Sequence, residues 1–164
     1  MRNREEDRTF FNRQTSLRLH EEHLATVQLW SRVEQVIVTR APEADLLETL
    51  RRGAAALDDE VTRHFHFEER ELFPRLAEAG EGDIAELLAE EHETIRTAAQ
   101  ALRELLRLGQ PDAAAMQQMR ALGLELAERL VAHVQKEEMA LLPALEDLLD
   151  EETDRELALT YAAS

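Results

Sequence analysis

The sequence contains no cysteine, and this absence excludes several kinds of site at once. Disulfides, thiolate metal ligands, iron–sulfur clusters and cysteine nucleophiles all require this residue. Glycine and proline are also scarce, with 5 and 4 copies in 164 residues, and aromatic residues make up only 4%. Leucine and alanine are abundant while β-branched residues are few, so the composition favours helices over a sheet.

Basic residues are in deficit, because 19 lysines and arginines stand against 35 acids and give a formal net charge of −16. Such a chain is repelled on average by nucleic acids and by anionic membranes, so neither is expected as a partner. No apolar run approaches the roughly 18 residues of a membrane helix, and the first residues lack the apolar core of a secretion signal. We therefore expect a cytoplasmic protein.

Apolar residues at helical spacing fill four long segments, roughly 16–39, 43–79, 83–108 and 112–150. Short breaks that contain proline or glycine separate these segments. Short loops between long amphipathic helices make consecutive helices antiparallel. We therefore predict an all-α, up-down-up-down four-helix bundle. We expect residues 1–164 to form a single domain, with an N-terminal arm at 1–15, the bundle at 16–150 and a short C-terminal helix or tail at 151–164.

Polar residues at the start of each segment predict where the helices begin. We expect Thr15 or Ser16 to cap the first helix, Asp83 the third and Asp112 the fourth. Prolines lie near the ends of the second and fourth segments, and we expect each to kink or end its helix; they are Pro74 and Pro143.

The second half of the chain repeats the first. LAEEHETIR at 88–96 is similar to LHEEHLATV at 19–27, and AHVQKEEMALLPAL at 132–145 is similar to RHFHFEERELFPRL at 63–76. Five residues match at the same separation of 69 positions. The repeat predicts two helical hairpins related by duplication, whose equivalent residues meet near a central pseudo-two-fold axis.

Six polar residues of this repeat lie on apolar helix faces that should point into the core. His64 and Glu68 are four residues apart, and so are their repeats His133 and Glu137, so each pair shares one helix face. A buried imidazole or carboxylate without a partner is costly. A layer of His–Glu hydrogen bonds is one explanation, but a metal site accounts better for all six, namely His23, His64, Glu68, His92, His133 and Glu137.

The donor set limits the choice of metal. Imidazole and carboxylate ligands without sulfur suit iron, manganese or zinc. Six side chains are too many for one ion, so we expect two ions bridged by Glu68 and Glu137. With an oxide or hydroxide as a further bridge, each ion would keep one position for a diatomic or peroxidic ligand.

Together these motifs resemble the hemerythrin-like, or HHE cation-binding, domain family. The resemblance rests on HFHFEE at 64–69 followed by LFP, on EEH at 21–23 and 90–92, and on AHVQKEEMALLP at 132–143. It implies a non-haem di-iron centre held by the six residues above. Oxygen carriers of the family have a further histidine where this chain has Arg96, and an aspartate where it has Glu137. The pattern is therefore closer to bacterial members of the H-HxxxE-H-HxxxE type, which are linked to peroxide, nitric oxide or iron handling.

Two classes of function stay open at this point. The first is a di-iron protein that binds or reacts with O2, H2O2 or NO, with a catalase-like or NO-related activity left undecided. The second is an iron sensor or iron donor without turnover. A ferritin-like oxidase ranks lower, because that class uses Glu and ExxH motifs. The sequence does not decide whether the protein forms a homodimer.

Several residues near the six keep two readings. Glu22 and Glu91 either are solvated or orient a histidine. Glu69 and Glu138 either lie at the surface or serve as orienting partners or occasional ligands. His66 is expected at the surface, and so is His20, with a role as a fifth histidine ligand or as an entrance residue as the alternative for His20. Tyr161 is expected to be a packing residue, with a role beside a redox centre as the alternative.

Overall fold

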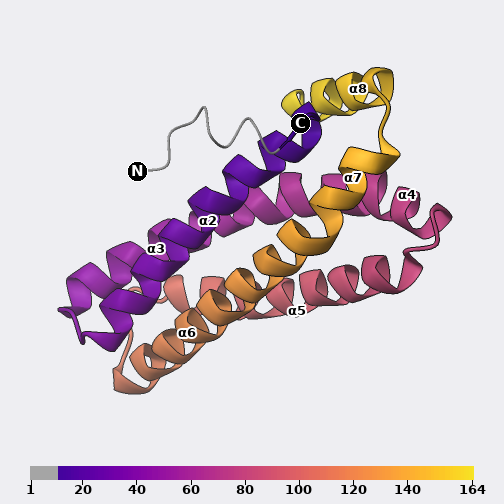
Figure 1. The fold of residues 1–164 in the computed structure, drawn as a ribbon. Helices are drawn as coiled ribbons and strands as arrows, with labels where there is room; N and C mark the ends of the chain where they lie inside the picture. Colours follow the sequence, from indigo (N-terminus) through magenta and orange to yellow (C-terminus); the bar gives the residue numbers. More distant parts are fainter. Residues whose placement is uncertain (1–10) are drawn as a thin grey trace.

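The computed structural model describes residues 11–164, and all regular elements in this range are helical (Figure 1). Three of them are short π-helical turns inside longer helices. In chain order the elements are α2 (Gln14–Val38), α3 (Glu43–Glu60), the π-turns η1 (Val61–Phe65) and η2 (Glu68–Leu72), α4 (Phe73–Glu78), α5 (Gly82–Leu106), α6 (Ala113–Lys136), the π-turn η3 (Glu137–Leu141), α7 (Leu142–Leu148) and α8 (Glu151–Ala162).

The long helices form an antiparallel bundle. The elements from α3 to α4 make one continuous rod and those from α6 to α7 make another, as Figure 1 shows. Helix α2 packs against α3 and α6, and α5 packs against α6 and the α3–α4 rod. Helix α8 lies across one end of the bundle against α2. The predicted all-α bundle with a short C-terminal helix is confirmed. No helix within residues 11–164 is long and apolar enough to span a membrane.

The core consists of two apolar clusters with a polar layer between them. One cluster contains Trp30 and Ile95, and the other contains Leu19 and Leu88. On α2 the polar layer falls between Leu19 and Trp30, and on α5 it falls between Leu88 and Ile95. The apolar clusters therefore hold the four helices on both sides of the polar residues and shield those residues from water.

The helix starts agree with the sequence only in part. Asp112 caps α6 as predicted, since its Oδ1 accepts a hydrogen bond of 2.8 Å from the backbone N–H of Ala115. The capping prediction for Asp83 is wrong, because α5 already begins at Gly82 and Asp83 lies in its first turn. A carboxylate there still stabilises the helix through the dipole.

The first helix also begins earlier than expected. Helix α2 starts at Gln14, so neither Thr15 nor Ser16 is its cap. The carboxylate of Asp154 on α8 takes over this role and accepts hydrogen bonds from the backbone N–H groups of Gln14 and Thr15 at 2.8 and 2.9 Å. The expected arm therefore stops short of residue 15, and its residues 1–10 lie outside the described part of the chain.

Neither proline ends its helix. The chain stays helical past Pro74 to Glu78, and past Pro143 to Leu148. Proline lacks an N–H and clashes with the carbonyl four residues earlier, and a wider π-turn directly before it accommodates this defect. The two widened turns, η2 and η3, begin at Glu68 and Glu137.

Candidate metal centre

The six residues singled out in the sequence meet in the polar layer. They come from all four long helical rods of the bundle, and each is at most 2% exposed. They fall into two groups, in each of which the ligand-type atoms lie within 4.8 Å of one another. The first group is His23, His64, Glu68 and Glu137, and the second is Glu68, His92, His133 and Glu137. The groups share both glutamates, so two carboxylates lie between two pairs of histidines.

Each shared carboxylate faces two histidines, one from each hairpin. Oε1 of Glu68 lies 3.2 Å from Nε2 of His64 and 3.5 Å from Nε2 of His92. Oε1 of Glu137 lies 2.8 Å from Nε2 of His133 and 3.4 Å from Nε2 of His23. Exchange of the two hairpins thus maps one set of contacts onto the other, as the repeat predicts.

A ring of four further glutamates surrounds the histidines. Each histidine approaches one of these glutamates with Nδ1, the imidazole nitrogen that points away from the centre. The contacts are His64–Glu22 at 2.9 Å, His133–Glu91 at 2.9 Å, His92–Glu69 at 3.0 Å and His23–Glu138 at 3.2 Å. Partners in the two hairpins again differ by 69 positions. Of the two readings left open for these glutamates, the structure supports the orienting one.

Hydrogen bonds keep the first two of these glutamates ionised. Burial raises the pKa of Glu22, but hydrogen bonds from His64 and Tyr161 outweigh it and lower the pKa to about 2. Burial likewise raises the pKa of Glu69, and hydrogen bonds from His92 and a neighbouring arginine lower it to about 2. Both side chains are therefore carboxylates at neutral pH.

The other two glutamates of the ring behave in the same way. The hydrogen bond from His133 lowers the pKa of Glu91. Burial raises the pKa of Glu138, but the hydrogen bond from His23 brings it below its ordinary value. An ionised carboxylate only accepts hydrogen bonds, so each histidine donates through Nδ1. Each Nε2 is then directed into the centre, where it can bind a cation once it has released its proton.

These inward atoms lack the partners that buried polar atoms require. Nε2 of His92 and Nε2 of His133 lie 3.0 Å apart, and two ring nitrogens at this distance need a shared proton or a cation between them. Elsewhere in the centre, Nε2 of His23 and of His64 and both carboxylate oxygens of Glu68 have no hydrogen-bond partner. Unsatisfied buried groups are costly. Cations would satisfy them, so the residues present fit a site for metal ions.

Arg96 stands where the oxygen carriers have their further histidine. It donates hydrogen bonds to both carboxylate oxygens of Glu69, at 2.6 and 2.9 Å. Its guanidinium also lies over the ring of Phe65, which stacks on His92 with ring centroids 3.8 Å apart. Position 96 therefore braces the carboxylate that orients His92 and contributes no ligand atom. The covering ring of Phe65 was not predicted, and only its place beside His64 could have indicated it.

The remaining residues with two readings lie outside the two groups. Nδ1 of His20 is 2.6 Å from Oε1 of Glu138, so His20 contacts the ring of glutamates and is not a purely peripheral residue. His66 is exposed, as predicted. Tyr161 is buried and donates its hydroxyl hydrogen bond to Glu22, so it both packs and contacts the centre.

The four-helix bundle and the two overlapping His/Glu groups in its core are typical of metal-binding helical bundles. Comparison with protein families agrees with this class. The family described as "Hemerythrin HHE cation binding domain" matches residues 16–153, and the chain therefore belongs to the hemerythrin HHE cation-binding family. A comparison with curated protein sequences gives no match.

Proposed function

We propose that this protein is a non-haem di-iron protein that binds or reacts with O2, peroxide or nitric oxide. The observation that carries the proposal is the pair of four-residue groups that share Glu68 and Glu137. One ion needs no more than one such group, whereas two groups with common carboxylates match the arrangement of a dinuclear site. In this proposal the ligands are His23, His64, Glu68, His92, His133 and Glu137.

Iron is proposed because the donors are four imidazoles and two carboxylates without sulfur. Two iron ions held there would supply coordination positions and electron exchange for a small ligand. The protein residues would do the rest. The ring of glutamates fixes the imidazole orientation, and the apolar clusters on both sides exclude bulk water. Phe65 covers His92 on one side of the centre.

The test is the metal content of protein from iron-supplemented cells, together with visible spectra before and after reduction and exposure to peroxide or NO. Two irons per chain and a spectrum that responds to these ligands are the expected result. Glu78→Ala, at an exposed position on the same helical rod as Glu68, is the matched control for ligand variants.

Three results would redirect the proposal. Zinc alone, with no response to redox agents, would contradict it. Two irons that bind ligands without any turnover would favour a sensor or iron donor over an enzyme. Stoichiometric iron in Glu68→Ala would refute the ligand assignment.

A further inference from the structure

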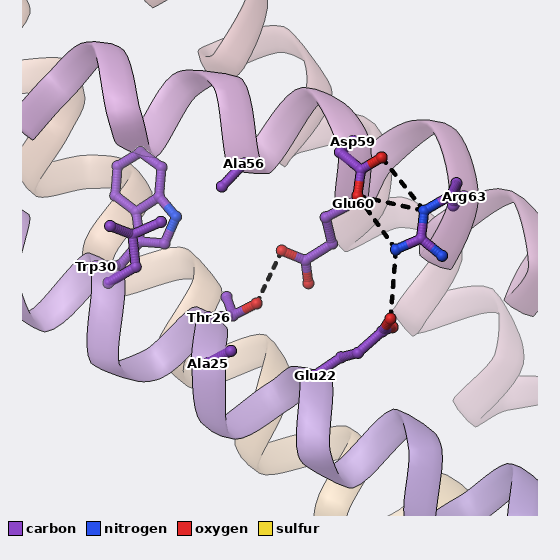
Figure 2. Close-up of a pocket in the computed structure, with 9 residues that line it drawn as sticks. Glu22, Ala25, Thr26, Trp30, Ala56, Asp59, Glu60 and Arg63 are labelled. Atoms are coloured by element: carbon purple, nitrogen blue, oxygen red, sulfur yellow. Dashed lines mark hydrogen bonds and ion pairs between the residues drawn. The ribbon is translucent and has the colours of Figure 1, made fainter.

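A pocket opens between α2 and α3 beside the candidate metal centre (Figure 2). It has a volume of about 170 Å³. Trp30 lies at one end, and Glu22 and Arg63 lie at the other. Ala25 is at an exposed position in the lining, and Glu60 reaches from α3 toward α2. The pocket thus lies next to the half of the centre that contains His23 and His64, because Glu22, which lines it, accepts the hydrogen bond of His64.

Glu60 is a buried acid that belongs to neither metal group. It is 9% exposed and lies at the end of α3, four residues before His64. Its Oε2 accepts a hydrogen bond of 2.9 Å from Oγ1 of Thr26, which lies three residues after His23 on α2. The Glu60–Thr26 pair therefore sits one helical turn beyond the His23–His64 pair and lines the pocket.

The surroundings of Glu60 favour its protonated form. Burial raises its pKa, and the charge of His64 and the hydrogen bond from Thr26 reduce this effect only in part. The charged or titratable groups around it come from α2, from its own helical rod and from η2, and are Glu22, His23, Asp59, Arg63, His64 and Glu68. A carboxylic acid with a raised pKa holds its proton more firmly than an exposed one and can donate it to a ligand bound in the pocket.

The other half of the centre has the equivalent pocket without the acid. A pocket of about 260 Å³ lies between α5 and α6, and its lining includes Glu91, the repeat of Glu22. At the positions that correspond to Thr26 and Glu60, this second pocket has Ile95 and Arg129. Both halves of the repeat therefore have a pocket at this place. Of these two pockets, only the one between α2 and α3 is lined by a buried carboxyl group.

We infer that the pocket between α2 and α3 is the access route for a small ligand of the peroxide class, and that Glu60 gives this ligand a proton at the His23–His64 half. The inference rests on the proposed function. It assigns different roles to the two halves of the centre, although each half has two histidines and the same two glutamates. The step is a proton transfer only. The O–H bond of Glu60 breaks, the proton forms an O–H bond on the ligand, and the carboxylate then regains a proton from hydronium that the solvent supplies through the pocket.

The first test concerns the proton and uses the metal-free protein. Glu60→Gln keeps the shape and the acceptor for Thr26 but removes the acid, and Arg129→Gln is the matched control at the repeated position. Infrared spectra at neutral pH should show the carbonyl stretch of a protonated carboxyl group in wild type and in Arg129→Gln, and Glu60→Gln should lack it. The absence of this band from the wild type, or its persistence in Glu60→Gln, would overturn the role of Glu60.

The second test concerns the route and uses the iron-loaded protein with azide as the probe. Ala25→Trp should fill the mouth of the first pocket and slow azide association at least tenfold. Thr94→Trp is the control, because Thr94 is the repeat of Ala25, is also exposed and lines the second pocket. Equal azide association rates in the two tryptophan variants would overturn the proposed route.

Peroxide consumption then tests the inferred ligand class. At equal iron content and melting temperature, Glu60→Gln should consume peroxide at least about tenfold more slowly than wild type, since proton donors typically contribute factors of about 10²–10⁴. Arg129→Gln should retain the wild-type rate. Azide binding without any peroxide consumption by the wild type would overturn this inference and leave the di-iron proposal standing. A wild type that responds to neither ligand would overturn both.

Discussion

Oε2 of Glu22 accepts a hydrogen bond of 2.9 Å from Nδ1 of His64, and this bond joins two different helical rods of the bundle. Glu22 directly precedes His23 in the sequence. On α2, His23 therefore belongs to the first metal group, while Glu22 orients His64 across the helix interface. The repeat does the same with Glu91 and His133 at 2.9 Å. Correct packing of the helices thus sets the direction of each imidazole.

Loss of an orienting carboxylate should weaken metal binding without removing a ligand. Residues of this kind typically contribute about 10–100-fold to metal affinity. We expect a loss of this size in Glu22→Gln and in Glu91→Gln, measured by competition with a chelator. Tyr161→Phe removes only the hydroxyl donor to Glu22 and should cost less. Unchanged affinity in both glutamine variants would contradict the orienting role.

Loss of a shared carboxylate should affect both groups at once. Glu68 belongs to both four-residue groups, whereas His92 belongs to only one of them. We expect Glu68→Ala to bind no stoichiometric metal and His92→Ala to bind less metal than wild type but more than Glu68→Ala, as measured by elemental analysis. Similar losses in the two variants would argue against two overlapping groups.

Addition of metal should raise the melting temperature. A ligand at 100 times its Kd stabilises the folded state by about 2.7 kcal/mol. For a chain of this size the expected rise is about 5–10 °C, from about 2–4 °C per kcal/mol. Calorimetry of the metal-free and loaded forms checks this, and Glu68→Ala is the variant in which the rise should vanish. An equal rise in Glu68→Ala would show that metal stabilises the protein at another place.

The metal-free protein should lose stability at alkaline pH. Burial lowers the pKa of His133, but the charge and hydrogen bond of Glu137 raise it to about 10. Burial also lowers the pKa of His23, and the nearby carboxylates of Glu137 and Glu138 raise it to about 9. A pKa raised by folding contributes stability that is complete below the ordinary value of 6.5 and is lost as the pH rises through about 9–10. Urea unfolding at a series of pH values should show this decline, and a flat profile up to pH 10 would contradict it.

The acidic side of the same profile should also decline. The pKa values of Glu22 and Glu69 fall from 4.5 to about 2 in the folded protein. Their contribution is therefore present above pH 4.5 and is lost as the pH falls toward 2. The free energy of unfolding of the metal-free protein should be greatest between about pH 4.5 and 6.5. Glu22→Gln, matched with Glu21→Gln at an exposed position beside it, should flatten the acidic decline.

The six central residues could be found in the sequence because two local signals coincide there. Helical spacing places His64 and Glu68 on an apolar face, and the repeat places His133 and Glu137 on an equivalent one. Both signals can be recognised in the sequence without knowing which helices contact each other. The antiparallel bundle follows from equally local information, namely long amphipathic segments and short breaks.

What the sequence did not decide depends on contacts between distant segments. Glu22 and Glu69 each adjoin a central residue in the sequence, about 100° away on the helix surface, and only the neighbouring helix shows that they meet an imidazole. Asp154 replaces the expected cap of α2 from more than a hundred positions away. Glu60 carries no motif at all, and its burial arises from the packing of α2 on α3.

The shared position of Glu68 and Glu137 has a consequence for how the protein fills with metal. A cation bound by His23 and His64 would draw both carboxylates into the geometry that the second cation needs, because the same two side chains complete the second group. If two ions bind as proposed, loading should be positively cooperative, and a partly supplied population should divide into empty and full molecules. A titration that follows each ion separately should find the singly occupied chain as a minor species throughout.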